Sequence, residues 1–445
     1  MIAVPAAPLA PDEAARRAAA EPGAFWLSAP APDEVGIARD MVGAAPVDVV
    51  RGDGPADLAR VERAWADARA AWGASGAPAV AGIPALVGWF SYDLGRAFIG
   101  LPARAGGDQA WPLVEVHSHD AVWVRDAGGA ATIFAHDAAA ARRLEERLSR
   151  PARAVRVRIG ALAADHGDDL FLSGVERILE YLRAGDAYQV NLSRRLSAAC
   201  APGAAAPVAL AAALRARAPA PHAALIASVD GEGALVGNSP ERFLAVTADG
   251  AIETRPIKGT RSRGETPDAD RAAAAALAAS PKDRAEHVMI VDLERNDLGR
   301  VCQTGSVGVG SLARVVALPT VFHMVSTVHG RLRPDIGLSA LLEATFPGGS
   351  VTGAPKISAL DHIAAFEPVG RGASMGALGR VWPNGDVELA LTIRTFAVAD
   401  GRIHLWVGGG VVWDSDPQEE IEESWVKARP LLTAVGAPVE EPAAT

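Results

Sequence analysis

The chain has 445 residues, of which 49% are hydrophobic and 22% are charged, and its formal net charge at pH 7 is −10. This composition is typical of a globular protein with a well-buried core, and the acidic balance excludes a general nucleic-acid-binding role. The chain has two cysteines, Cys200 and Cys302, which excludes a disulfide scaffold and a cysteine-rich zinc site.

Neither end of the sequence nor its interior indicates membrane targeting. Residues 1–22 include prolines and early acidic residues, and they lack the charged-then-apolar layout of a signal peptide. No apolar run approaches the roughly 20 residues that a membrane-spanning helix needs. We therefore expect a cytoplasmic protein that does not enter a membrane.

Residues 1–160 mix short strand-like segments with alanine-rich helical ones. Pro84–Phe98 predicts a buried strand followed by a turn, and Ala141–Arg150 predicts a charged helix that Pro151 ends. The segment Ala161–Asp169 combines small, polar and glycine residues, and it is the best linker candidate in the chain.

An amphipathic helix is predicted directly after this linker. Asp168 or Asp169 is expected to cap its start, and Gly185 lies just past its end. Its apolar residues recur at spacings of three, four and seven: Leu172, Val175, Ile178, Leu179 and Leu182.

Strands follow the helix. Tyr188–Leu196 alternates, which places Gln189, Asn191 and Ser193 on one face. The stretch from residue 223 to residue 259 predicts antiparallel strands, and glycine-containing turns at 230–233 and 248–250 separate them.

The C-terminal part predicts a hairpin over Val387–Gly410 and a closing helix over Glu419–Leu432. A two-residue turn at Asp400-Gly401 would place Arg394 opposite Val407–Gly408. Strands and helices alternate without a regular βαβ rhythm, which indicates an α+β fold.

Two predicted helices, Lys282–Arg300 and Gln418–Ala428, are rich in carboxylates. On the second, Glu420 and Glu423 share a face, and Lys427 follows Glu423 by four residues. The pattern alone fits a solvated helix with an ordinary Glu–Lys pair. The alternative is a magnesium site, since magnesium binds through a few oxygen ligands and keeps several waters.

Three further residues have both an ordinary and a catalytic interpretation. Glu241 follows a proline near a strand and is either a surface residue or a buried general acid with a raised pKa. Lys258 is either a surface lysine or a nucleophile, if it is desolvated or close to another cation such as Arg255. His323, flanked by apolar residues, is either a satisfied core histidine or a catalyst.

Two glycine-rich segments, Phe346–Lys356 and Val407–Val412, can present backbone N–H groups to an anion, or they form plain turns and tight contacts. Neither matches the spacing of a phosphate-binding loop or of a dinucleotide-binding turn, so nucleotide and flavin binding are not supported.

Taken together and in order, these segments resemble the family of chorismate-utilising enzymes over residues 170–432. The N-terminal part resembles the family more loosely, mainly through Gly88–Arg96. The motifs that carry the resemblance are GDAYQVNLS, SPERF, TRPIKGT, KDRAEHVMIVDLERNDLGRVC, FPGGSVTGAPK, LTIRT, GGGVVWDSDPQEE and EESWVKA.

The resemblance implies an anthranilate-synthase-like α+β fold. Large antiparallel sheets with surrounding helices would enclose an active site in a central cavity. It also implies an N-terminal region over 1–160, similar to anthranilate synthase component I, and a chorismate-binding catalytic domain over 165–435. Some members bind tryptophan in the N-terminal region, and the sequence leaves open whether this chain does.

The resemblance further implies site residues and a Mg²⁺ cofactor. Glu286 and Glu423 align with magnesium ligands, and Glu420 lies beside them. Glu241 aligns with the general acid for the C4 hydroxyl of chorismate, and His323 aligns with an active-site histidine. The groups that align with the holders of the substrate carboxylate are Arg394, Lys427 and the backbone amides of Gly408 to Gly410.

Two positions bear on which reaction is expected. Members that add water use a lysine base where this chain has Gln189, and an amide cannot take up a proton at neutral pH. Anthranilate synthases carry alanine where this chain has Lys258. The resemblance is therefore closest to component I of aminodeoxychorismate synthase, in which the lysine forms a covalent bond to the ring.

The alternatives are an anthranilate synthase component I and, less favoured, a catalytically silent chorismate-binding subunit. Ser374, Arg380 and His222 stand where the family usually has aromatic residues, and Arg380 replaces a tyrosine expected near the substrate carboxylate. An aminating member is expected to receive ammonia from a glutamine amidotransferase partner, component II. Neither Cys200 nor Cys302 has the glycine-flanked setting of an amidotransferase nucleophile.

Overall fold

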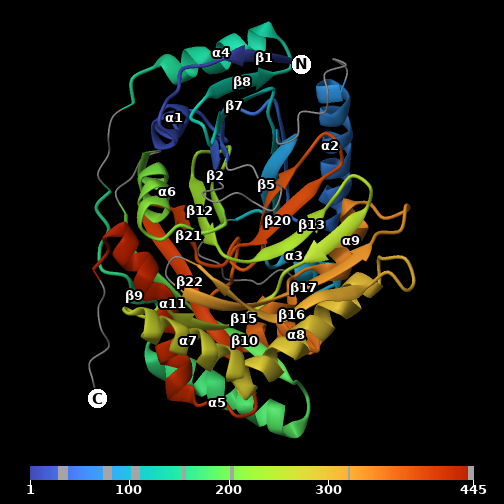
Figure 1. Cartoon of the computed structure of the whole chain (residues 1–445), viewed down its shortest axis with the longest axis vertical. Helices are drawn as coiled ribbons and strands as arrows, with labels where there is room; N and C mark the ends of the chain where they lie inside the picture. The colour runs from blue at the N-terminus through green and yellow to red at the C-terminus, as the bar shows by residue number, and fades with distance from the viewer. Residues whose placement is uncertain are drawn as a thin grey trace.

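The computed structural model describes residues 1–28, 39–73, 83–101, 111–152, 157–200, 205–318 and 321–438. Within these residues the chain forms two large sheets, whose strand pairings are antiparallel, with helices around the outside (Figure 1). The predicted α+β class and the large antiparallel sheets are confirmed.

The first sheet contains 12 strands in the described part of the chain. In spatial order they are β1 Ile2–Pro5, β8 Ala131–Ala135, β7 Ala121–Asp126, β3 Arg39–Gly43, β2 Phe25–Ser28, β11 His222–Ala227, β12 Gly233–Ser239, β21 Thr395–Ala399, β22 Arg402–Val411, β10 Gln189–Ala199 and β18 Gly353–Ala354, with β9 Ala163–Ala164 beside β10.

The second sheet contains ten strands within the same described ranges. They are β15 Ile257–Ser262, β17 Val321–Arg331, β14 Ala251–Thr254, β13 Arg242–Val246, β20 Val387–Leu391, β19 Ala377–Val381, β5 Leu86–Phe90, β6 Val114–Ser118 and β4 Asp48–Gly52, with β16 Gly308–Ala317 beside β17.

The helices pack on the outer faces of the sheets, where α11 covers β22, α10 covers β10, and α8 covers β15 and β17 (Figure 1). Their bounds are α1 Pro11–Ala18, α2 Leu58–Gly73, α3 Leu94–Phe98, α4 Ala138–Ser149, α5 Asp168–Ala184, α6 Ala205–Arg217, α7 Pro267–Ala279, α8 Pro281–Gly299, α9 Leu338–Thr345, α10 Lys356–Phe366 and α11 Pro417–Val435, with short 3-10 turns at Pro55–Asp57 and Gly349–Val351.

Local sequence signals explain where these helices begin. Side-chain oxygens of Asp137, Ser280 and Asp416 accept backbone N–H groups at the starts of α4, α8 and α11. The amphipathic helix α5 ends at Gly185, which has φ +85. Its start was predicted wrongly, because Gly167 occupies the cap position and Asp168 instead pairs with Arg194.

The predicted linker is more ordered than expected. β9 lies inside it and pairs with Leu196 and Ser197 of β10, and α5 begins at Asp168. Both large sheets contain strands from residues 1–160 and from residues 165–435, since β2 pairs with β11 and β5 pairs with β19. One continuous buried apolar cluster spans both regions, and the boundary between them stays a prediction.

The chain passes between the two sheets at two places that matter for the site. After β12 it leaves the first sheet through Pro240 and Glu241 and enters the second sheet at β13. After β20 it returns through Thr392–Arg394 and enters the first sheet at β21. The predicted hairpin therefore has the Asp400-Gly401 turn, with positive φ at both residues, but its first arm is divided between two sheets.

Candidate active site

Glu241 and Arg394 occupy the two crossings between the sheets. The crossings lie side by side, because the N–H of Leu391 donates to the carbonyl of Glu241 at 3.1 Å and the N–H of Asn238 donates to the carbonyl of Arg394 at 3.2 Å. Arg394 has φ +50, so its backbone turns out of the strand direction at this point. The crossings thereby place the carboxyl group of Glu241 and the guanidinium group of Arg394 where the chain passes between the two sheets.

Glu241 is almost fully buried, with 4% of its surface exposed. Its Oε1 accepts from the hydroxyl of Ser350 at 2.6 Å and from the N–H of Ile257 at 3.4 Å. Burial raises the pKa of Glu241 from 4.5 to about 6, against the opposing effects of Ser350 and Lys258. The structure thus gives Glu241 the environment that the buried-acid interpretation requires.

Lys258 lies on β15 and donates from Nζ to the carbonyl of Ser350 at 3.2 Å. Burial lowers the pKa of Lys258, Glu286 opposes that effect, and the cation Lys427 adds to it. The sequence suggested Arg255 as a neighbouring cation, and in the structure Arg255 pairs with Glu253, at 3.1 Å from Nε to Oε1. A desolvated amine of this kind is the form in which lysine acts as a nucleophile.

Gln189 is the first residue of β10, and its side chain approaches Gly410 of β22, as that of Lys258 does. A methyl group built on Gly410 of the neighbouring strand β22 would lie 2.4 Å from Nε2 of Gln189 and 3.2 Å from Nζ of Lys258. Glycine at 410 therefore lets both side chains approach the strand. Gln189 is fully buried, and neither polar atom of its amide has a hydrogen-bond partner among the described residues. A buried unpaired amide is costly, which fits a group that a small polar ligand satisfies.

His323 lies on β17, opposite Thr260 of β15, whose hydroxyl is 2.9 Å from Nδ1 of the histidine. Its Nε2 is buried without a partner in the described part of the chain. Burial, and next Arg394, lower the pKa of His323 to about 3, so the ring is neutral at physiological pH. The histidine is only half satisfied, which distinguishes it from a fully hydrogen-bonded core histidine.

Two carboxylates of α11 lie close to the glycine segment of β22, Gly408 to Gly410. A methyl group on Gly409 would lie 2.8 Å from Oε2 of Glu420 and 3.1 Å from Oε1 of Glu423, so glycine at this position leaves room for the two carboxylates. Lys427 donates to Oε1 of Glu423 at 2.6 Å and to the carbonyl of Gly408 at 2.8 Å. The Glu–Lys pair expected from the sequence is present, but it lies against a strand.

The donor set of Glu286, Glu420 and Glu423 fits a divalent cation. Burial, and then the charge of Glu423, raise the pKa of Glu420 to about 7, and Glu423 also contributes to the raised pKa of Glu286. Oε2 of Glu420 is buried without a hydrogen-bond partner in the described ranges. Across those ranges no three metal-binding side chains gather tightly enough to hold an ion alone. Magnesium does not need that, because it keeps waters and substrate oxygens as ligands.

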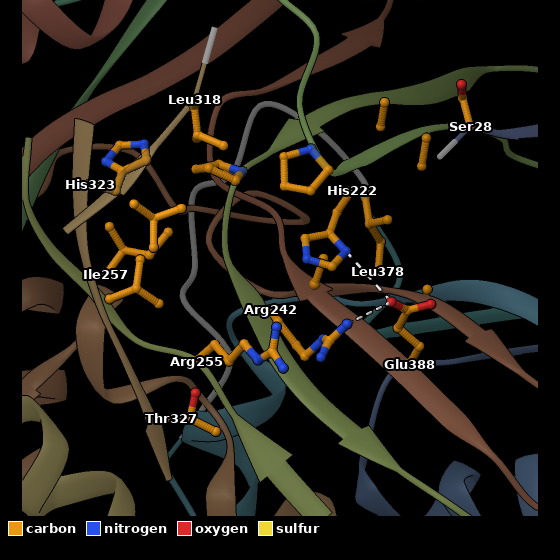
Figure 2. Close-up of a pocket in the computed structure, with 18 of the residues that line it drawn as sticks. Ser28, His222, Arg242, Arg255, Ile257, Leu318, His323, Thr327, Leu378 and Glu388 are labelled. Carbon is orange, nitrogen blue, oxygen red and sulfur yellow. Dashed lines mark ion pairs between the residues drawn. The ribbon is translucent and has the colours of Figure 1, made fainter. Parts of the chain in front are cut away.

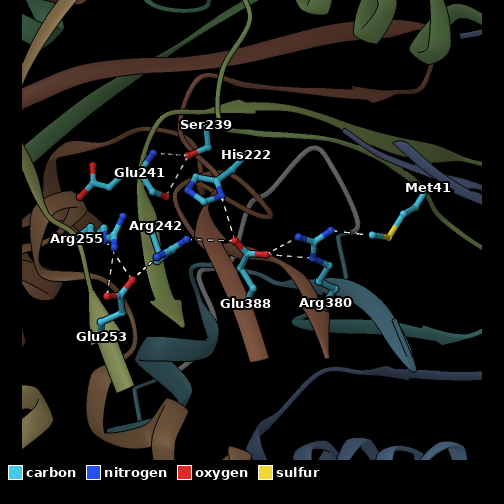
Figure 3. Close-up of polar contacts among 9 residues, drawn as sticks. All are labelled: Met41, His222, Ser239, Glu241, Arg242, Glu253, Arg255, Arg380 and Glu388. Carbon is cyan, nitrogen blue, oxygen red and sulfur yellow. Dashed lines mark hydrogen bonds and ion pairs between the residues drawn. The ribbon is translucent and has the colours of Figure 1, made fainter. Parts of the chain in front are cut away.

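Three residues that replace usual aromatic side chains lie away from these carboxylates. Arg380 donates to Glu388 from Nη2 at 2.6 Å and from Nε at 3.1 Å, and His222 lies 3.8 Å from the same carboxylate (Figure 3). In the structure the partner of Arg380 is Glu388, and a place for Arg380 near a substrate carboxylate stays a prediction. Ser374 is buried in the turn after Arg371.

A cavity of about 450 Å³ lies between the two sheets, next to these groups. Of the candidate residues, His323 borders it, and Pro240 and Ile257 border it as the chain neighbours of Glu241 and Lys258 (Figure 2). The remaining candidate residues do not border the cavity. The cavity and the cluster of residues around Lys258 are therefore neighbouring but separate sites.

Sequence reasoning missed Ser350. Its segment was singled out for its backbone N–H groups, whereas the structure uses the hydroxyl, which binds Glu241, and the carbonyl, which accepts from Lys258. The position of the hydroxyl between two candidate groups depends on a contact with residues about 100 positions away, so no local pattern indicates it.

A buried ion pair holds that loop in place, and sequence reasoning missed it as well. Arg371 pairs with Glu367 and also donates to the carbonyls of Val351 and Asn191 at 2.6 and 2.8 Å. Glu367 accepts the N–H of Ser193 at 2.8 Å. The pair therefore ties the loop that carries Ser350 to the start of β10.

Comparison with known proteins gives an independent finding. The family model described as chorismate binding enzyme matches residues 22–433. Anthranilate synthase component 1 1 of Haloarcula marismortui is 39% identical over 377 residues, which cover 78% of this chain and 75% of that protein. Aminodeoxychorismate synthase component 1 of Klebsiella aerogenes is 40% identical over 348 residues, covering 78% of this chain and 76% of that protein.

The fold is similar to that of a solved relative. The crystal structure of anthranilate synthase component I from Streptococcus pneumoniae TIGR4 superposes with a TM-score of 0.76 at 26% identity, covering 88% of this chain and 92% of that one. In the described part of the chain, no helix is long and apolar enough to cross a bilayer.

Proposed function

Because the chain belongs to the family of chorismate binding enzymes, we propose that it is component I of an aminodeoxychorismate synthase. It converts chorismate and ammonia into 4-amino-4-deoxychorismate, the precursor of 4-aminobenzoate and folate. The observation that carries this proposal is Lys258, which is half-buried beside Gln189 and close to a buried acid, Glu241. Relatives named anthranilate synthase and relatives named aminodeoxychorismate synthase are about equally similar, so the proposal rests on the lysine.

In the proposed reaction, neutral Lys258 attacks C2 of the ring with Nζ while the bond from C4 to its hydroxyl breaks. Glu241 gives its proton to that hydroxyl, which leaves as water. Ammonia then attacks C4, the bond between C2 and Nζ breaks, and a proton from the new ammonium group returns to Glu241. The environments support these roles, because burial favours the neutral lysine and the protonated acid together.

The other residues bind and orient the substrate in this proposal. Arg394, Lys427 and the amides of Gly408 to Gly410 hold a carboxylate, and His323 is a neutral hydrogen-bonding group. Magnesium, held by Glu286 and Glu423 with Glu420 beside them, would neutralise the ring carboxylate of chorismate. Gln189 cannot act as a base, so it favours ammonia over water as the nucleophile.

The identity of the product tests the proposal. Purified chain is incubated with chorismate, Mg²⁺ and ammonium, and the products are separated and weighed by mass spectrometry. We expect 4-amino-4-deoxychorismate, which keeps the enolpyruvyl group. Anthranilate with free pyruvate would establish the second candidate, anthranilate synthase component I, which the 39% identical Haloarcula relative favours. Unchanged chorismate under these conditions would instead indicate a silent binding subunit.

A further inference from the structure

One residue, Ser350, contacts both of the groups that the proposed reaction uses as acid and nucleophile. Its hydroxyl donates to Oε1 of Glu241 at 2.6 Å, and its carbonyl accepts from Nζ of Lys258 at 3.2 Å. Ser350 is itself buried, with 5% of its surface exposed. Hydrogen bonds in which one partner is ionised are stronger than neutral ones, so these contacts restrain both side chains. A single residue therefore sets where the acid and the amine lie relative to each other.

The short segment that carries Ser350 is held in place from several directions. It forms the 3-10 turn Gly349–Val351, and strand β18 directly after it pairs with the start of β10. A methyl group on Gly349 would lie 2.6 Å from Cδ2 of Leu293, so the turn packs closely against α8. Arg371 donates to the carbonyl of Val351 at 2.6 Å. These contacts hold the hydroxyl and the carbonyl of Ser350 in fixed positions.

The direction of the hydrogen bond between Ser350 and Glu241 follows from the partners of each atom. Within the described ranges Oε1 of Glu241 is the only partner of the Ser350 hydroxyl, so the hydroxyl places its proton there. Oε1 also accepts the N–H of Ile257 at 3.4 Å, whereas Oε2 makes no hydrogen bond in the same part of the chain. A carboxylic acid carries its proton on one of its two oxygens. Because two donors already point at Oε1, the acid proton of Glu241 belongs on Oε2.

The charged and titratable groups around Glu241 are Lys258 of β15, Arg394 at the second crossing and Glu294 of α8. Burial raises the pKa of Glu241 to about 6, and the hydrogen bond from Ser350 opposes that effect more than the charge of Lys258 or Arg394 does. Burial, with a smaller contribution from the charge of Glu241, raises the pKa of Glu294 to about 8. Glu294 therefore stays protonated at the pH at which Glu241 titrates, and Ser350 is the contact that most favours the ionised form of Glu241.

We propose that Ser350 is a positioning residue that keeps the acid proton of Glu241 on Oε2 and so fixes the oxygen that gives the proton up. The inference rests on the reaction proposed above. As the bond between C4 and its hydroxyl breaks, the proton moves from Oε2 to the departing oxygen, water leaves, and Glu241 becomes a carboxylate. The hydroxyl of Ser350 stays on Oε1 and stabilises the new negative charge. Its carbonyl holds Nζ of Lys258 on the same residue.

An infrared titration of the full chain without substrate tests the hydrogen bond itself. The band of the protonated Glu241 carboxyl is identified as the one that Glu241→Gln lacks. We expect its midpoint at about pH 6 in the unmodified chain. In Ser350→Ala the midpoint should lie about one pH unit higher, because the variant loses a hydrogen bond that favours the ionised form. A midpoint that does not move in folded Ser350→Ala would overturn the inference, whatever product the enzyme makes.

The pH profile of kcat tests the role of Ser350 in the reaction. In Ser350→Ala the low-pH plateau should fall about tenfold while the falling limb moves about one pH unit upward, and KM should change less than about twofold. A general loss of structure would lower the rate at every pH and leave the limb in place. Ser350→Thr keeps a hydroxyl and should restore both the plateau and the limb. Ser173→Ala, which removes an exposed hydroxyl on α5, should change neither.

The two titrations separate a failure of this inference from a failure of the proposed reaction. An unmoved infrared midpoint removes the role of Ser350 and leaves the proposed reaction intact. A moved midpoint with an unmoved kcat limb removes Glu241 as the acid, and the role of Ser350 with it. A Ser350→Thr variant that behaves like Ser350→Ala also excludes the hydroxyl. If circular dichroism shows that Ser350→Ala is unfolded, Ser350→Cys, whose thiol is a weak donor, should move the midpoint in the same direction, and an unmoved midpoint there would exclude the role.

Discussion

The environment of Lys258 changes its chemistry. An exposed lysine is protonated at neutral pH and cannot attack carbon. Here burial lowers its pKa, and the carbonyl of Ser350 orients Nζ at 3.2 Å. Glu286 opposes the effect of burial, so any cation that neutralises Glu286 should lower the pKa of Lys258 further.

We expect Lys258 to form a covalent adduct with the ring of chorismate when ammonia is withheld. Intact-protein mass spectrometry after incubation with chorismate and Mg²⁺ should show one added mass that maps to Lys258. The adduct should be absent from Lys258→Ala, whereas Lys282→Ala, which removes a lysine at the start of α8, should keep it. If Lys258→Ala makes 4-amino-4-deoxychorismate at the unmodified rate, covalent catalysis is excluded.

Glu241 leads to a prediction about pH. Its folded pKa is raised to about 6, and the proposed role requires the protonated carboxyl, so kcat should fall as the pH rises through about 6. Glu241→Gln cannot donate a proton, and it should lower kcat by about 10²–10⁴-fold while removing this falling limb. The kcat profile from pH 5 to 9 checks both effects. A falling limb of the same position in Glu241→Gln would assign it to another group.

At the scale of single residues, the sequence identified which side chains carry charge but not which ones meet. It placed Glu241 beside a proline and left its burial undecided, since its contacts include Ser350, which lies far along the chain. It suggested Arg255 as the cation near Lys258, whereas Arg255 pairs with Glu253 and the cation that lowers the pKa of Lys258 is Lys427. Local patterns do not contain these long-range contacts.

Helix α11 and strand β22 form the element on which the carboxylate site depends. Glu420 and Glu423 lie one turn apart and approach the strand at Gly409, where there is no side chain between them and the backbone. Helical periodicity predicted their common face correctly. It could not predict that the face covers a strand with no side chain at the point of contact.

Two neighbouring glutamates on α11 allow a matched test of magnesium binding. Glu423→Gln should raise the Mg²⁺ concentration needed for half-maximal rate by at least about tenfold, because it removes a charged ligand. Glu422→Gln changes an adjacent glutamate that pairs with Arg429, and it should leave the requirement unchanged. Initial rates over a Mg²⁺ titration give the answer. A Glu423→Gln variant with the unmodified Mg²⁺ dependence would remove Glu423 from the proposed site.

For the whole molecule, strand positions were largely predictable and the assignment of strands to sheets was not. The turns at 230–233, 248–250 and Asp400-Gly401 occur where glycine and aspartate indicated them. The two crossings between sheets carry no such signal, because Pro240 and Arg394 look like ordinary interruptions in the sequence. Those crossings are where Glu241 and Arg394 meet, so the architecture of the site followed from the resemblance and not from local pattern.

The chain as a whole should use ammonium but not glutamine. Its two cysteines are buried, at 5% and 4% exposure, and burial raises the pKa of both thiols, which is unfavourable for a nucleophile. The names of several relatives carry the words component 1, which implies a second component. Rates with ammonium chloride and with glutamine, measured on the same preparation, check this expectation. Efficient turnover of glutamine by the purified chain alone would contradict it.

The pairing of β5 with β19 has a consequence for synthesis on the ribosome. Gly88 of β5 lies opposite Gly379 of β19. One edge of β5 therefore stays unpaired during synthesis until its partner strand, about 290 residues later in the chain, has been made. At roughly 5–20 residues per second, that wait lasts about 15–60 s. All five residues of β5 are buried in the finished protein, and an open apolar edge of this kind invites pairing with other chains. The nascent chain is therefore a natural client for chaperones that shield unpaired strands until the C-terminal third emerges.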